Sequence, residues 1–237
     1  MIKRLFILFL IVVFISGCAT TRFISNPTLP QELKISGKDE NLEVVLNYLI
    51  IPNGPAAWVK DALWDEYVLS FRDISDKAVS VQKVRLIDPR GQYIERGFNP
   101  FQLEEETKSL AKIYTEMVGL EVVGTVGMVA IDAAAMLLGT AFIPIGILAG
   151  PAMMMGQNAK GQDMLKLQKE LERRQTFNFT LAPNGNYTGS AFFPIIPSPK
   201  ALVVEYMKGN EMRVLELSLE KLAGLHVAPK GSKKTSS

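Results

Sequence analysis

The sequence predicts a mainly β protein with an α-helical insertion. Two blocks of the chain, residues 41–98 and 176–226, contain short runs in which apolar and polar residues alternate between turn residues. Alternation with a period of two is typical of strands that bury one face. The stretch between the blocks, residues 99–175, instead combines helix-capping residues, a glycine-rich apolar sequence and a charged run with helical spacing. We therefore expect one β domain interrupted by a helical insert.

The β blocks contain eight predicted strands. Tyr67, Leu69 and Phe71 show the alternation most clearly, and the change of phase between Val81 and Val84 predicts a bulge. Many short strands separated by turns favour a two-sheet, immunoglobulin-like β-sandwich. The Cys…Trp…Cys pattern of antibody domains is absent, so the expectation concerns architecture only. The predicted strands fall within residues 42–51, 67–72, 79–86, 92–95, 177–181, 187–193, 202–206 and 215–219.

The insert begins with a helix-capping signal and ends with a second predicted helix. Asn99 can cap a helix, Pro100 suits its first position, and Gln102 can complete a capping box. At the other end, the run Met164–Arg174 places its apolar residues on one helix face and its basic residues near the negative end of the dipole.

The middle of the insert is expected to be a long apolar helical hairpin. Residues 117–156 contain only two charged residues, Glu121 and Asp132. The first predicted arm, Met117–Leu138, is long enough to cross a bilayer, whereas the second, Thr140–Met155, is short for a full span. Small residues at such spacings let helices approach closely. The candidate contact residues are Gly119, Gly124, Gly127, Ala130, Gly139, Gly146 and Gly150.

Three interpretations of this hairpin stay open. It can enter or lie on a membrane, pack between copies of the protein or against a partner, or be buried against its own sandwich. An apolar surface of this size is unusual on a soluble monomer, so we expect some contact to cover it. A homo-oligomer is one way to provide that contact.

The first seventeen residues predict a secretion signal. Lys3 and Arg4 precede ten apolar residues, Leu5–Phe14, and small residues follow. Ten residues extend only about 15 Å as a helix, which is too short for a hydrocarbon core of about 30 Å. The segment is therefore expected to target the chain rather than to span a membrane.

The residues at the end of this signal resemble a lipobox. Ile15-Ser16-Gly17-Cys18 matches the pattern that bacterial lipoproteins carry before their lipidated cysteine. The resemblance implies that the Cys18 thiol receives diacylglycerol, that the chain is cut before it, and that a fatty acid such as palmitate is added to the new amino group. Ala19, rather than aspartate, implies the outer membrane. The alternative is a plain secretion signal with a chance cysteine.

Residues 18–40, rich in polar residues, are expected to form a tether.

Composition narrows the functions that the chain can perform. The signal holds two of the 26 basic residues and none of the 24 acidic ones, so the mature chain is formally neutral and nucleic-acid binding is not expected. Cys18 is the only cysteine and His226 the only histidine, which excludes a Cys/His zinc site and a disulfide within the chain. We expect no cofactor, no enzyme activity, and a disordered tail over residues 227–237. A Ser-His-Asp triad would have to use His226, beside that basic tail.

Adjacent carboxylates in Trp64-Asp65-Glu66-Tyr67, with Asp61 nearby, could in principle serve acid–base chemistry or bind calcium. Neighbouring residues of a strand point to opposite faces, so Asp65 and Glu66 cannot both face one substrate. We expect a solvated strand edge here.

Two longer motifs resemble a group of uncharacterised proteobacterial lipoproteins. They are Trp58–Phe71, which includes Trp-Asp-Glu-Tyr, and Leu181–Pro194, which ends in Gly-Ser-Ala-Phe-Phe-Pro. Members share these strands, a lipobox and a glycine-rich apolar insert. The resemblance carries no activity or ligand and implies architecture and location only.

The expected function is that of a lipid-anchored cell-envelope protein that faces the periplasm and has a structural or interaction role. The alternative is a module that binds a lipid or hydrophobic peptide between hairpin and sandwich.

Overall fold

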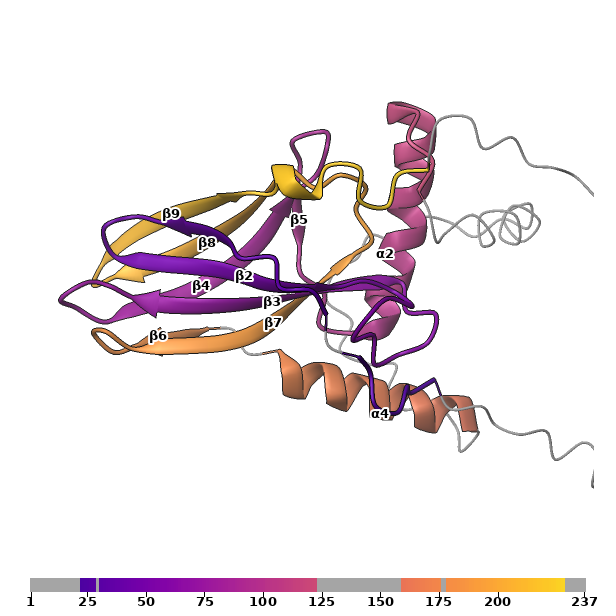
Figure 1. Cartoon of the computed structure of the whole chain (residues 1–237), viewed down its shortest axis with the longest axis horizontal. Helices are drawn as coiled ribbons and strands as arrows, with labels where there is room; N and C mark the ends of the chain where they lie inside the picture. Colours follow the sequence, from indigo (N-terminus) through magenta and orange to yellow (C-terminus); the bar gives the residue numbers. More distant parts are fainter. Residues whose placement is uncertain (1–21, 29, 123–158, 176–177, 229–237) are drawn as a thin grey trace, which may run out of the picture.

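The computed structural model describes residues 22–28, 30–122, 159–175 and 178–228, and these form two antiparallel sheets with two long helices at one end (Figure 1). The first sheet has the spatial order β1 (Ile35–Lys38), β2 (Leu42–Ile50), β3 (Trp64–Asp73) and β7 (Asn186–Pro194). The second has the order β5 (Tyr93–Glu95), β4 (Val79–Ile87), β8 (Ala201–Lys208) and β9 (Glu211–Ser218), with β6 (Phe179–Leu181) paired to β4. The prediction of a mainly β protein is confirmed.

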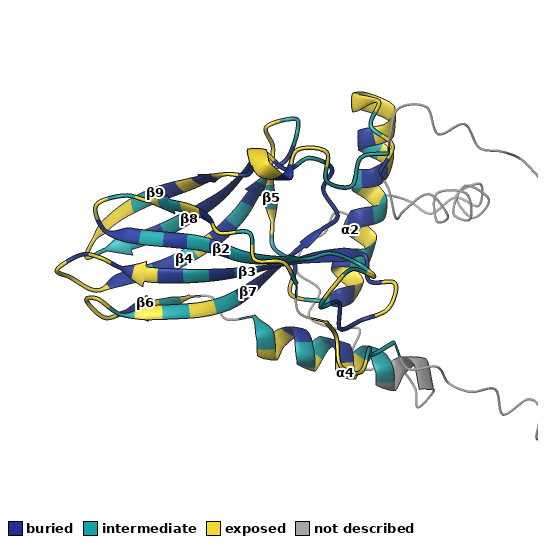
Figure 2. Ribbon diagram, viewed as in Figure 1, coloured by how far each residue is buried: buried dark blue, intermediate teal, exposed yellow. Residues whose placement is uncertain are grey.

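The two sheets share one apolar core. In β3, the residues Tyr67, Leu69 and Phe71 are fully buried, and they belong to the same cluster as Val84 and Leu202 of the other sheet. Each such side chain stabilises the fold by about 1.5–3 kcal/mol relative to an exposed one. Figure 2 shows the buried positions along the facing strands and the exposed ones at the turns.

The predicted bulge is present. The register of β4 against β8 shifts between Val81 and Lys83, which explains why the apolar alternation changes phase there. All eight predicted strands correspond to observed ones.

The predicted tether is wrong for its second half, because residues 35–38 form β1 and pair with β2. The short run Ile35-Ser36-Gly37-Lys38 has little strand character of its own. Gly37 permits β1 to lie close to the opposite sheet, because a Cβ at this position would lie 2.9 Å from Leu217 Cγ. The strand is therefore specified by its neighbours rather than by its own residues.

Helix α2 (Pro100–Ile113) begins where the sequence predicts. The Asn99 side chain accepts a hydrogen bond from the backbone N–H of Phe101 at 2.8 Å, and Pro100 opens the helix. The expected contribution of Gln102 to a capping box is not observed, because its amide donates to Glu106 at 2.8 Å instead.

Helix α2 does not extend through the predicted hairpin arm as one continuous helix. After Ile113 the chain forms the π-helical turn η1 (Tyr114–Val118), and Gly119 then adopts a left-handed conformation with φ of 69°. Val122 pairs with Val227 in an isolated β-bridge. The expectation of one helix over Met117–Leu138 is therefore wrong at its start, because Gly119 provides a left-handed C-cap.

Helix α4 (Ala159–Arg174) confirms the predicted charged helical run. Leu167 and Leu171 are buried, and Met164 packs beside them, as the helical spacing predicted. They join a second apolar cluster with Trp58 and Trp64, on the outer face of the first sheet. The helix thus covers one side of this sheet (Figure 1).

The prediction of a disordered tail over residues 227–237 is wrong for residues 227 and 228, and its remaining residues, 229–237, lie outside the described part of the chain. Val227 pairs with Val122, and the N–H of Ala228 donates to the carbonyl oxygen of Glu121 at 2.9 Å. The C-terminal segment is thereby attached to the chain just beyond α2.

Candidate functional site

The start of β3 carries two adjacent carboxylates that are both buried. Asp65 is 0% exposed and Glu66 is 2% exposed, so the expectation of a solvated strand edge is wrong. Their side chains contact different partners on the two faces of the sheet, in agreement with the strand geometry. The sequence could not reveal their burial, since the covering groups come from distant parts of the chain.

Asp65 binds the only histidine. Nε2 of His226 lies 2.9 and 3.0 Å from the two carboxylate oxygens of Asp65, and the imidazole itself is largely buried. His226 has a left-handed backbone with φ of 56°. The ring is turned inward and joins the C-terminal segment to β3.

Burial dominates the electrostatics of this pair. Desolvation raises the pKa of Asp65, and the charge and hydrogen bond of His226 oppose that rise. The neighbouring Tyr67 hydroxyl is fully buried and has no hydrogen-bond partner among the described residues. Its pKa is raised well above the usual value by burial and by the charge of Asp65. The pair thus links β3 to the C-terminal segment inside the buried part of the protein.

Glu66 anchors a polar network on the outer face. Nε1 of Trp58 and Oγ of Ser190 donate to its carboxylate at 2.7 and 2.6 Å. Arg174 of α4 approaches the same carboxylate at 3.5 Å, and its guanidinium lies 4.7 Å from the centre of the Trp58 ring. Burying a carboxylate is tolerable only with such partners. The Trp-Asp-Glu-Tyr and Gly-Ser-Ala-Phe-Phe-Pro motifs therefore meet in space at Glu66 and Ser190.

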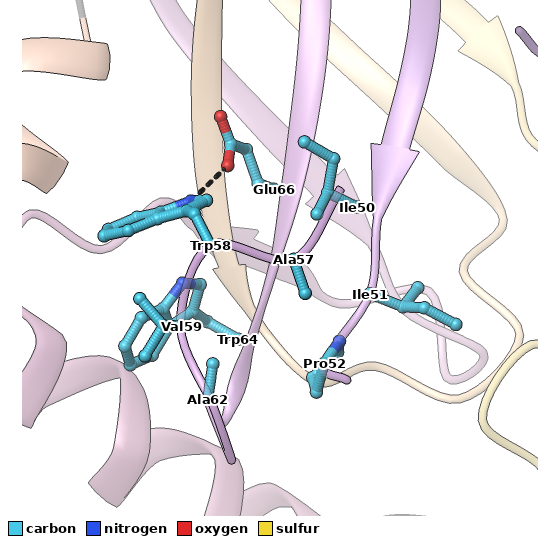
Figure 3. Close-up of a pocket in the computed structure, with 9 residues that line it drawn as sticks. All are labelled: Ile50, Ile51, Pro52, Ala57, Trp58, Val59, Ala62, Trp64 and Glu66. Carbon is cyan, nitrogen blue, oxygen red and sulfur yellow. Dashed lines mark hydrogen bonds between the residues drawn. The ribbon is translucent and has the colours of Figure 1, made fainter. Parts of the chain in front are cut away.

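A small pocket lies beside this network (Figure 3). Its cavity volume is only about 10 Å³, room for little more than one water-sized group, which is far below the roughly 300–1,000 Å³ of typical small-molecule sites. Glu66 accepts a hydrogen bond from the Trp58 indole and lies at one side of the pocket. The residues that line the pocket are Ile50, Ile51, Pro52, Ala57, Trp58, Val59, Ala62, Trp64 and Glu66.

The first described residues are fixed to the body at this same end. Arg22 donates to the carbonyl oxygen of Asp61 at 3.0 Å and forms an ion pair with Glu104 of α2 at 2.9 Å. Phe23 pairs with Val59 in a β-bridge, and its ring lies 6.1 Å from that of Trp58. The predicted tether is therefore attached to the body from Arg22 onward.

Three points where the described chain begins or breaks share one end of the molecule. Arg22 pairs with Glu104 of α2, Val122 follows η1, and Ala159 is the first residue of α4. Both helices lie at one end of the sheets (Figure 1). The turns between β6 and β7 and between β8 and β9 lie at the opposite end (Figure 1). Any attachment made through the segments beyond these points would act on the helical end.

Most of the sequence-predicted site residues fall outside the described part of the chain. Gly119 is described, and it ends η1 in a left-handed conformation. The lipid-attachment residue and the other candidate contact residues lie outside the described residues: Cys18, Gly124, Gly127, Ala130, Gly139, Gly146 and Gly150.

Sequence reasoning missed the contacts that hold this end together. Arg22 and Glu104 are separated by 82 positions, and Asp65 and His226 by 161. No local signal marks such pairs, because the two partners of each pair are far apart in the sequence.

Within the described ranges, no helix is both long and apolar enough to span a bilayer, and no group of three or more His, Cys, Asp or Glu residues could hold a metal ion. No family model, curated protein or solved structure matches the chain.

Proposed function

We propose that the protein is a lipid-anchored component of the bacterial cell envelope with a structural or interaction role and no enzymatic activity. The observation that carries the proposal is the lipobox-like run that ends in Cys18, the only cysteine of the chain. Several acyl chains on one residue provide stable anchoring, whereas one provides only reversible binding. Ala19 favours the outer membrane, with the body facing the periplasm.

The position of Arg22 supports a short connection between lipid and body. Only residues 19–21 separate Cys18 from Arg22, which is fixed to Asp61 and Glu104. Four steps of extended chain reach roughly 14 Å at most. A lipid on Cys18 would therefore hold the helical end of the body close to the bilayer surface.

The proposal includes the finer architecture expected from the sequence. The body would be immunoglobulin-like at the level of two packed sheets, although the order β1-β2-β3-β7 differs from the ABED order of constant-type domains. Residues 99–175 would form the inserted hairpin. Its apolar part would contact the membrane, a partner or a second copy through residues 117–156, and both Val122 and Ala159 lie at the end that the anchor would hold.

The alternative function is a module that binds a lipid or hydrophobic peptide. The pocket beside Trp58 favours it by position but is small for such a ligand. Native mass spectrometry of gently extracted protein tests it: a co-purified ligand would support binding, and a bare chain would count against it.

Fractionation of membranes tests the anchor. A Cys18→Ala chain that also lacks residues 123–158 should move from the membrane to the soluble fraction, because both proposed attachments are lost. The matched control replaces Thr20 by Ala in the same deletion background and should stay with the membrane. A double variant that remains in the membrane fraction would contradict the proposal.

A further inference from the structure

Two exposed aromatic rings stand at the start of α2. Phe98 is 52% exposed and Phe101 is 46% exposed, although large apolar side chains of this kind are usually buried. We refer to Phe98 and Phe101 as the phenylalanine patch. The Arg96 guanidinium lies 4.2 Å from the centre of the Phe98 ring and shields one of its faces. The rings nevertheless remain open to contact from outside the molecule.

The patch lies close to the point where the proposed anchor would reach the body. Phe101 precedes Glu104 by three positions of α2, so the two side chains lie on the same helix face about 5–6 Å apart at Cβ. Glu104 binds Arg22, the fourth residue after Cys18. The phenylalanine patch is therefore within one helical turn of the attachment of the N-terminal segment.

We infer that the phenylalanine patch rests in the headgroup layer of the phospholipid bilayer that receives the acyl chains of Cys18. This inference rests on the proposed function, because the short connection from Cys18 brings the patch to the bilayer surface. Aromatic rings are favoured at the boundary between headgroups and acyl chains. The contact sets the orientation of the body, with the sheets extending away from the membrane.

The charges beside the patch indicate an apolar contact rather than an electrostatic one. Glu104 is paired with Arg22, and Glu105 with Lys108 at 2.9 Å, so two of the acidic residues beside the patch are locally compensated. The contact should therefore depend little on the fraction of anionic lipid in the bilayer.

Depth measurement by spin labelling tests the inference. The lipidated full chain, carrying either Phe101→Cys or the control Met212→Cys, is labelled with a nitroxide and placed in phosphatidylethanolamine vesicles with or without phosphatidylglycerol. Acylated Cys18 does not react, so each protein carries one label. Met212 is a good control because it is 54% exposed and follows the β8–β9 turn at the far end of the molecule.

The label at residue 101 should collide several-fold less with an aqueous nickel reagent, and more with oxygen, than the label at residue 212. Equal aqueous accessibility at the two positions, in protein shown to carry fatty acid, would contradict the membrane contact of the phenylalanine patch without contradicting the lipid anchor. Absence of fatty acid on Cys18 would contradict the lipid anchor, and with it the membrane contact of the phenylalanine patch, which depends on that anchor. An unchanged melting curve for each variant confirms that the substitution at either exposed position preserves the fold.

Discussion

At the scale of single residues, the hydrogen-bonded pair of Asp65 and His226 helps to fix the position of the C-terminal segment. The carboxylate is fully buried, and the imidazole that covers it comes from a residue in a left-handed conformation. Breaking a buried pair by removing one partner is costly because the other polar group stays buried without its hydrogen bond. The pair is thus a stabilising contact only while both members are present.

His226→Ala should lower the free energy of unfolding at pH 7 by about 1–3 kcal/mol, because the buried Asp65 carboxyl group loses its hydrogen-bond partner. Urea unfolding measures the loss. The control is the same substitution in an Asp65→Asn background, where no carboxylate is left unpaired and the cost should be much smaller. Equal costs in the two backgrounds would show that the hydrogen-bonded pair is not the reason for the effect.

The loss caused by His226→Ala should also depend on pH. Burial raises the pKa of Asp65, and removing His226 removes the interaction that opposes this rise. A group with a raised pKa in the folded state favours folding at low pH, and that contribution disappears as the pH rises through the folded pKa. The variant should therefore lie closer to the wild type at pH 4 than at pH 7. A larger deficit at pH 4 would contradict this assignment.

At the scale of secondary structure, the sequence predicts elements whose signal is local. The strands with alternating residues, the bulge in β4 and the cap at Asn99 could all be predicted, because each depends on residues within a few positions. Strand β1 could not, since its pairing with β2 and its close approach to Leu217 are set by distant residues. The end of η1 at Gly119 was missed because apolar composition continues beyond it.

Asn99→Ala should destabilise the protein by about 1 kcal/mol, since the first turn of α2 loses its side-chain cap. Thermal unfolding measures the change. Gln102→Ala is the matched control: its amide bonds Glu106 within the helix and contributes no cap, so the effect should be a few tenths of a kcal/mol. A reversed order of the two effects would contradict the observed capping.

Leu171→Ala should cost about 2–5 kcal/mol, because it opens a cavity where α4 packs on the first sheet. Leu165 of the same helix is 47% exposed, and its replacement by alanine should change stability by less than about 0.5 kcal/mol. Chemical denaturation of both variants compares them directly. Similar effects at the two positions would mean that α4 is not held through this face.

At the scale of the whole molecule, both long helices lie at one end of the two sheets (Figure 1). The N-terminal segment, α2, α4 and both borders of residues 123–158 lie at this end, and the sheets extend from it (Figure 1). This arrangement could not be predicted from the sequence, which predicts a lipid anchor and an insert but not that they share one side of the molecule. The contacts of Arg22 explain it: a segment expected to be a free tether is fixed beside α2.

The mass of the intact protein, extracted from membranes of the cells that make it, tests the central claim most directly. The account predicts a chain that begins at Cys18 and whose mass exceeds that of its amino acids by a diacylglycerol and one further acyl group, both assigned to that residue by fragmentation. A chain that keeps residues 1–17 and an unmodified cysteine would contradict it.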